Sequence, residues 1–328
     1  MTNSPSMENI VPEQAKVAPE STQAPTQAAS SALPLLIRLP AGIALNEIEA
    51  QEMAAAHATR IIVLAGSVDC GKTTLLTSLY ELYQSGPIKV YRFAGCETLP
   101  AFEQRCHLSR TDSENDRADT SRTVYSPEPE YLHIRVDDMT DGFNHIDFLF
   151  TDVSGEMYEH ARDSTTECEQ LTFLKRASHF LLFLDGEKAV QPDKRWAMFQ
   201  DAKSLLRSCL DSNMLDRECF ITVVWSKCDY FEVAANKEPL ADFVKTVEAE
   251  ITSVLANRIS NYKFHKVAAR PTQFPALEMG YGLKELLVDW VDNWPQGKRM
   301  NLEPPANNGG QRESELFAKR HNAGNVNT

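Results

Sequence analysis

The sequence lacks several features that would mark particular classes of protein. It has no apolar run close to the roughly 20 residues that span a bilayer. Residues 1–32 have neither the basic start nor the apolar core of a secretory signal. The seven cysteines are scattered without a CxxC pair, which is typical of reduced thiols in the cytosol. We therefore expect a cytoplasmic protein that does not contact a membrane.

Positive charge is also sparse. The chain carries 33 lysines and arginines against 46 aspartates and glutamates, which gives a formal net charge of −13. No run of lysine or arginine interrupts this acidic composition. Because affinity for nucleic acid depends on clustered cations that contact the phosphate backbone, we do not expect a nucleic-acid partner.

The composition divides the chain into a central domain and two tails. Both ends are rich in small and polar residues and cannot bury enough apolar surface to offset the entropy of ordering. The expected parts are a disordered N-terminal tail at 1–42, a leading helix at 43–59, a domain at 60–297 and a disordered C-terminal tail at 298–328.

Strand and helix patterns alternate along the central domain, and most of the strands are apolar throughout. This predicts an α/β fold, a three-layer sandwich with a mostly parallel six-stranded sheet. The expected strands lie at 60–65, 131–136, 145–152, 179–185, 219–225 and 262–268, and the expected helices at about 72–84, 167–177, 193–210, 240–259 and 283–294.

Two connections in this domain stand out. Asp141-Gly142 separates the second and third expected strands, which predicts an antiparallel hairpin at the edge of the sheet. The long stretch 86–130 is rich in charged and hydroxyl side chains and has few apolar anchors. We expect this insertion to be a loop over the functional site.

The first strand leads into a phosphate-binding motif. The residues Gly66-Ser67-Val68-Asp69-Cys70-Gly71-Lys72-Thr73 match G-x-x-x-x-G-K-[ST] between a strand and a helix. Glycines allow successive N–H groups to converge on one anion, and the helix directs its positive end at the same point. Lys72 is predicted to contact the β- and γ-phosphates and Thr73 to bind Mg²⁺, and Thr74 completes the expected nucleotide-binding set.

A second motif follows one hairpin later. Asp152 ends an apolar strand and Gly155 comes three residues after it. This D-x-x-G pattern would let Asp152 hold a water of Mg²⁺ while the Gly155 N–H meets the γ-phosphate, although such a pattern also occurs in ordinary turns. Glu156 has two interpretations: it orients the attacking water, or it pairs with a nearby arginine, which we favour.

Two further loops provide possible contacts to a base. Ser226, Lys227 and Asp229 follow a buried strand, where Asp229 can accept hydrogen bonds from guanine N1 and N2 and the Lys227 stem can cover the purine. After the next strand, Ala269 can offer its N–H to guanine O6, with Arg270 beside the base. The alternative for the first of these loops is a plain polar turn. All these motifs follow the carboxyl ends of expected strands, where such sheets bind ligands.

The segments "GSVDCGKTT", "DVSGE", "SKCD" and "VAAR" together resemble the GTPases of the TRAFAC clade over roughly residues 60–295. Residues 93–136, followed by "TDVSGE", are most similar to the bacterial double-GTPase group. The resemblance implies a Ras-like domain that binds GTP and GDP with Mg²⁺, hydrolyses GTP and switches a protein effector, in a group associated with bacterial conflict and defence. Ser226, Glu156 and Ala268 depart from the pattern and weaken the expectation of guanine preference and fast hydrolysis.

The resemblance also implies a first switch within "RTDSENDRADTSRTVY". Thr123, or alternatively Thr120, would bind Mg²⁺ there, and Arg117 or Arg122 would supply a catalytic arginine worth roughly 10³ to 10⁵ in rate. The favoured alternative is that these arginines pair with acidic residues of the same loop. Two other functions remain compatible with the motifs: a nucleotide-gated interaction module with negligible hydrolysis, and an ATP-using P-loop enzyme.

Overall fold

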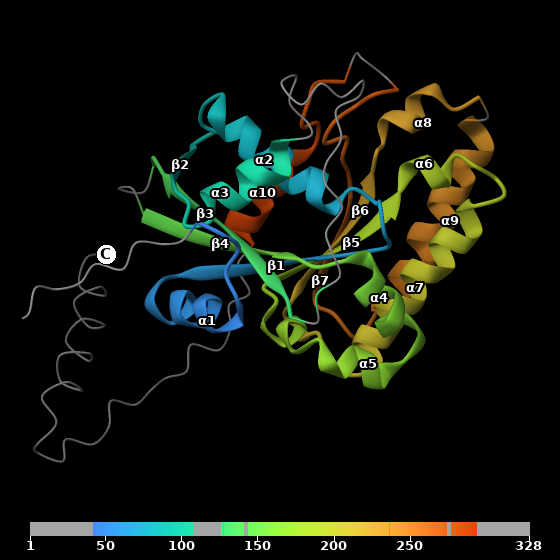
Figure 1. Ribbon diagram of the computed structural model, residues 1–328. Helices are drawn as coiled ribbons and strands as arrows, with labels where there is room; N and C mark the ends of the chain where they lie inside the picture. The colour runs from blue at the N-terminus through green and yellow to red at the C-terminus, as the bar shows by residue number, and fades with distance from the viewer. Residues whose placement is uncertain are drawn as a thin grey trace, which may run out of the picture. The chain divides into compact units, whose positions relative to one another are not determined.

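The computed structural model describes residues 42–107, 126, 128–140, 144–235, 237–273 and 277–293 (Figure 1). Both expected tails fall outside these residues, apart from Gly42. The segment that holds Arg117, Thr120, Arg122 and Thr123 lies outside them as well, as does the Asp141-Gly142 turn. No helix in the described part of the chain is long and apolar enough to cross a membrane.

The core of the fold is a seven-stranded sheet with the order β2-β3-β4-β1-β5-β6-β7. Neighbouring strands from β4 to β7 run parallel, β3 is antiparallel to β4, and β2 is antiparallel to β3. The strands are β1 Thr59–Ala65, β2 Tyr91–Gly95, β3 Glu130–Asp138, β4 Asn144–Asp152, β5 His179–Asp185, β6 Phe220–Ser226 and β7 Asn261–Lys266. The predicted α/β class with a mostly parallel sheet is confirmed.

The sheet has one strand more than the six that were predicted, and the extra strand lies in the stretch 86–130. This stretch also forms α3 Leu99–Cys106, so the prediction of one long loop is wrong. Phe102 and Cys106 are fully buried, which shows that a few apolar side chains anchor the segment. Because β2 pairs with β3, the β3–β4 hairpin is not at the edge of the sheet as predicted; β2 is.

Helices cover both faces of the sheet, and each face has its own apolar cluster. Figure 1 shows α2, α3 and α10 on one side and α1, α4 and α5 on the other, and the two clusters divide the buried side chains in the same way. The helices are α1 Glu47–Ala56, α2 Lys72–Gln84, α4 Gly155–Asp163, α5 Thr165–Gln170, α6 Gly186–Ala189, α7 Arg195–Asp211, α8 Asp229–Val233, α9 Lys237–Leu255 and α10 Leu283–Asp292, with a 3₁₀ helix at Thr172–Arg176. This is the predicted three-layer arrangement.

The last helix is fastened to the sheet by packing on β4 and by hydrogen bonds from β1. Trp290 is 1% exposed and meets Phe150 edge to face, with ring centroids 5.4 Å apart. The Arg60 guanidinium, from β1, donates hydrogen bonds to the carbonyls of Trp290 and Val291. A cation at the negative end of a helix satisfies carbonyls that have no partner within the helix. The contact fixes α10 against the sheet that carries the phosphate loop.

Candidate functional site

The phosphate loop joins β1 to α2 and is closed by its own lysine. Gly71 has φ +95° and forms the N-cap of α2, so the loop turns sharply into the helix. Lys72 Nζ donates to the carbonyls of Gly66 and Ser67, both at 2.9 Å. It also lies 5.9 Å from the ring centroid of the buried Tyr158. The ammonium is therefore held across the mouth of a backbone loop at the positive end of a helix, where an anion is favoured.

Cys70 lies within this loop and is 1% exposed. Burial raises the pKa of its thiol above the ordinary value, although Lys72 partly opposes the shift. A buried neutral thiol behaves as a small apolar side chain. Cys70 thus fills space under the loop.

The D-x-x-G motif lies directly against the phosphate loop. Thr73 Oγ1 donates toward Asp152 Oδ1 at 3.5 Å. A Cβ added to Gly155 would lie 2.4 Å from the backbone nitrogen of Val68, a separation that only glycine permits. Glu156 lies in the first turn of α4, and its N–H donates to Ser154 Oγ at 3.2 Å. The structure therefore places Asp152 and Gly155 against the phosphate loop that contains Lys72 and Thr73.

The side-chain oxygens of Thr73 and Asp152 suit a hard divalent cation. Mg²⁺ is commonly bound by one or two protein oxygens together with waters and substrate phosphates. The Thr73 hydroxyl and the Asp152 carboxylate form such a set. Among the described residues there is no group of three or more histidine, cysteine, aspartate and glutamate side chains that could hold a metal by itself.

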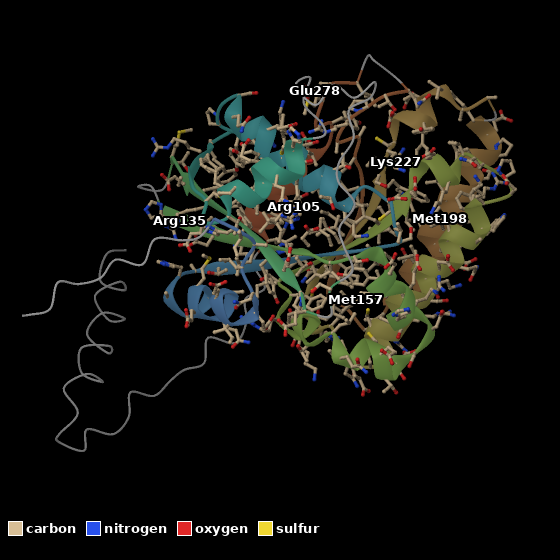
Figure 2. The ribbon with its side chains drawn as sticks, viewed as in Figure 1. Arg105, Arg135, Met157, Met198, Lys227 and Glu278 are labelled. Atoms are coloured by element: carbon tan, nitrogen blue, oxygen red, sulfur yellow. The ribbon has the colours of Figure 1, made fainter. Side chains whose placement is uncertain are left out.

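Arg105 is a residue of this site that sequence reasoning missed. Its Nε donates to Asp152 Oδ2 at 2.5 Å, and its Nη2 donates to Glu130 Oε2 at 3.0 Å. Arg105 lies in the last turn of α3 and is labelled in Figure 2. The only signal in the sequence was an arginine upstream of the switch segment, and the chain has several of these.

A cavity of about 160 Å³ continues from the phosphate loop toward the end of the sheet that carries β6 and β7. Its lining combines the head of α2 with the loops that follow β5, β6 and β7. The lining residues are Gly71, Thr74, Leu75, Phe183, Glu187, Ser226, Lys227, Asp229, Tyr230, Val267, Ala268, Ala269, Arg270 and Thr272. The structure thus brings the expected base-contacting residues together in one hollow beside the phosphate loop.

Asp229 is fixed within this cavity by backbone donors. Its Oδ2 accepts hydrogen bonds from the N–H groups of Thr272 at 2.9 Å and Gln273 at 3.0 Å, and the residue is 2% exposed. Backbone amides that satisfy one oxygen hold the carboxylate in place. The loop after β7 therefore positions the side chain that was expected to read the base.

Lys227 is held by two acidic residues, one that ends β5 and one that follows it. Its Nζ contacts Asp185 Oδ2 at 3.2 Å and Glu187 Oε2 at 2.9 Å, and its φ is +49°. Burial disfavours the charged ammonium, but Asp185 and Glu187 outweigh burial and raise the pKa of Lys227. The hydrogen bond from Lys227 lowers the pKa of Glu187 in turn. Sequence reasoning did not foresee these carboxylates as partners of Lys227.

Ser226 and Arg270 brace the cavity from its two sides. Ser226 Oγ donates to the Leu184 carbonyl at 3.2 Å and so joins the ends of β6 and β5. Arg270 Nη2 donates to Glu81 Oε2 of α2 at 2.6 Å. Arg270 therefore lines the cavity as expected, but it also ties the loop after β7 to the helix that begins at Lys72.

Comparison with known proteins identifies the family of this chain. The bacterial selenocysteine-specific elongation factor EF-Sec is a structural match with 17% sequence identity and a TM-score of 0.35, over 72% of this chain and 28% of that chain. This chain therefore spans little more than a quarter of the length of EF-Sec. A search of curated proteins finds no match. The sequence profile of the Double-GTPase 2 family matches residues 60–291, which cover every described motif of the site. The chain therefore belongs to the Double-GTPase 2 family.

Proposed function

We propose that this protein binds GTP together with Mg²⁺, hydrolyses it to GDP and phosphate, and acts as a nucleotide-dependent switch. Membership in a GTPase family supports guanine nucleotide as the ligand. The observation that carries the proposal is the shared cavity, in which Gly71 and Thr74 of the phosphate end meet Asp229 and Ala269 of the base end. One molecule with a triphosphate at one end and a purine at the other matches this lining.

At the phosphate end, the chain supplies backbone donors and the Lys72 ammonium. Lys72 exchanges the carbonyls of Gly66 and Ser67 for oxygens of the β- and γ-phosphates, with a gain because the phosphate oxygens carry negative charge and the carbonyls are neutral. The N–H groups of residues 67–73 and the N-terminus of α2 bind the same anion. Gly155 lies against Ser67 and Val68, so its N–H is close enough to report the γ-phosphate.

At the base end, Asp229 selects guanine. Its carboxylate only accepts hydrogen bonds, and guanine offers two donors, N1–H and N2–H, where adenine has no donor at N1. Asp229 Oδ2 is already held by Thr272 and Gln273, so the carboxylate is pre-organised at little entropic cost. Lys227 covers the purine face with its stem while Asp185 and Glu187 retain its ammonium.

Hydrolysis requires a metal and an oriented water. Mg²⁺ held by Thr73 and by a water on Asp152 would neutralise the charge that develops on the phosphate oxygens. Lys72 stabilises the same charge from the other side. Glu156, in the first turn of α4, is the described side chain that we assign to the water, and Thr123 and Arg117 or Arg122 complete the proposed set.

A second candidate function is a nucleotide-gated interaction module with negligible hydrolysis. It is favoured by Glu156, whose charge repels phosphate more than a neutral side chain would. Phosphate release far slower than the release of bound GDP, together with GTP-dependent retention of a partner protein, would support this candidate.

The test is equilibrium binding of a fluorescent GTP analogue in the presence of Mg²⁺. We expect saturable binding that unlabelled GTP displaces at least tenfold more effectively than ATP. Lys72→Ala should abolish it, whereas Lys245→Ala, a change at an exposed position of α9, should not. Release of labelled phosphate in a single turnover then measures hydrolysis. Equal displacement by ATP would contradict guanine selection, and absence of saturable binding would contradict the proposal as a whole.

A further inference from the structure

The helix that carries Arg105 is packed firmly against the phosphate end of the site. Phe102 of α3 stacks on Tyr80 of α2, with ring centroids 5.0 Å apart, and Tyr80 Oη donates to Glu103 at 2.6 Å. Phe102 and Cys106 are fully buried. Since α2 begins at Lys72, α3 is fixed to the same element that presents the phosphate lysine. Arg105 therefore projects from a supported helix.

The Arg105 guanidinium is tied down by several acceptors. It donates to Asp152 Oδ2 and Glu130 Oε2, and its Nη1 donates to the Ala101 carbonyl at 3.2 Å. Its side chain is 14% exposed and that of Asp152 is 3% exposed. A charge-assisted hydrogen bond in such a shielded position is stronger than one on the surface. The hydrogen bond between Arg105 and Asp152 is therefore an integral part of the site.

The same carboxylate is the one that we assign to the metal. Asp152 Oδ2 faces Arg105, while Oδ1 lies 3.5 Å from the hydroxyl of Thr73. A guanidinium and a divalent cation on opposite sides of one carboxylate repel each other, and burial reduces the screening of that repulsion. Each of the two cations therefore weakens the interaction of the other with Asp152.

We propose that Arg105 competes with Mg²⁺ for Asp152 and thereby weakens metal-dependent retention of nucleotide. This inference rests on the proposed function, because it needs Mg²⁺ and a guanine nucleotide at the site. Arg105 acts through Asp152 and is a positioning residue. Metal binding then weakens the contact between Arg105 and Asp152, which couples occupancy of the metal site to the C-terminal end of α3.

A different role for Arg105 would give the opposite sign. If Arg105 served to orient Asp152 for the metal, its removal would weaken Mg²⁺ binding. If it competes with the metal, its removal will strengthen Mg²⁺ binding. The direction of the change therefore separates the two roles, and a role in folding alone would give no change in metal dependence.

The experiment measures the rate at which a fluorescent GDP analogue leaves the protein as free Mg²⁺ is varied. The readout is the Mg²⁺ concentration that gives half of the maximal slowing. For Arg105→Gln, which keeps an aliphatic stem, we expect this concentration to fall about tenfold, as for the loss of one charge-assisted hydrogen bond. Arg105→Lys, which keeps the charge but not the planar fork, should give an intermediate value.

The matched control is Arg258→Gln. Arg258 pairs with Asp211 at 2.6 Å, where both side chains are about half exposed, and neither residue lines the cavity. Its midpoint should stay within twofold of the wild type, and circular dichroism should show the same fold for every variant.

Each possible outcome either supports or overturns the inference. An Arg105→Gln midpoint that is unchanged or raised overturns the inference while leaving the proposed function intact. Wild-type protein that binds no guanine nucleotide overturns the proposed function, and the inference with it. If Arg105→Gln does not fold, the Arg105→Lys midpoint decides: a lower value supports competition and an unchanged or higher one overturns it.

Discussion

The two ends of the cavity are built in different ways. The phosphate end is built on one continuous loop, residues 66–73, in which Lys72 bonds to backbone carbonyls of the same loop and against which Asp152 and Gly155 lie. The base end consists of loops after β5, β6 and β7, which are joined by side chains. Asp229 bonds to backbone N–H groups more than 40 residues away, at sequence separations of 43 and 44.

This difference assigns phosphate affinity and base selectivity to different parts of the proposed site. Under the proposed function, affinity for phosphate comes mainly from the backbone geometry of one short segment. Under the same proposal, discrimination between bases comes from side chains whose positions depend on several separate loops. We therefore expect changes at the phosphate end to remove binding, and changes at the base end to alter selectivity while phosphate contacts persist.

The largest effect is expected for Lys72→Ala. It removes the ammonium that we assign to the phosphates, and each hydrogen bond to a charged group contributes about 1.5–3 kcal/mol. Affinity for GTP and for GDP should fall at least about 100-fold by calorimetry. Lys245→Ala is the control, and a loss below threefold at Lys72 would contradict the division between the two ends.

Gly155→Ala should come next. The added Cβ would lie 2.4 Å from Val68 N and 2.7 Å from the Ser67 carbonyl carbon, so the two loops must separate. Overpacking of this kind costs about 2 kcal/mol, or roughly 30-fold in GTP affinity. Affinity for GDP, which lacks the γ-phosphate, should fall less, and competition binding measures both.

Gly86→Ala is the matched control for this change. Gly86 has φ +140°, and no atom lies within 4 Å of a Cβ built there, so this variant reports backbone strain without a collision. Equal losses of GTP and GDP affinity in Gly155→Ala would show that Gly155 does not respond to the γ-phosphate.

Asp229→Asn tests the base end. The asparagine oxygen can still accept from Thr272 and Gln273, while its amide N–H₂ now opposes the guanine donors. GTP affinity should fall about tenfold and xanthosine triphosphate should bind in its place, since one misplaced hydrogen bond costs about 1–3 kcal/mol. Inorganic tripolyphosphate should bind both proteins equally.

Asp211→Asn is the control for the loss of an aspartate charge, because Asp211 pairs with Arg258 at an exposed position. A fall in tripolyphosphate affinity for Asp229→Asn would show that the two ends are not separable.

The smallest effect is expected for the link between the ends. Arg270 and Glu81 form an ion pair at 2.6 Å between the loop after β7 and α2. Arg270→Ala should weaken GTP binding about threefold, and a double-mutant cycle with Glu81→Ala should give a coupling energy of about 1 kcal/mol. Additive losses would mean that α2 and the base loop act independently.

Much of the fold could be predicted because its signals are local. The helix expected at 72–84 has those same bounds as α2, and the strand expected at 179–185 has those of β5. Fully buried parallel strands are apolar on nearly every residue, and this makes them easy to find. The segments β2 and α3 were missed because they are short and are anchored by isolated side chains such as Tyr91 and Phe102.

The helix expected at 167–177 illustrates a different error. It divides into α5 and a 3₁₀ helix on either side of Leu171, which is buried with φ −78° and ψ +62°. Helical periodicity continues across this break, so the pattern of apolar residues gave no warning. Tertiary packing of Leu171 decides where the first helix ends.

The sequence by itself determined the α/β layers and the phosphate loop, because periodic burial and a contiguous turn need no distant partner. The tertiary structure alone decided that Arg105 meets Asp152, that Thr272 and Gln273 hold Asp229, and that Asp185 and Glu187 hold Lys227. Each of these contacts joins side chains or amides whose spacing in the chain carries no information. Only the packing of the helices and the pairing of the strands bring them within hydrogen-bonding distance.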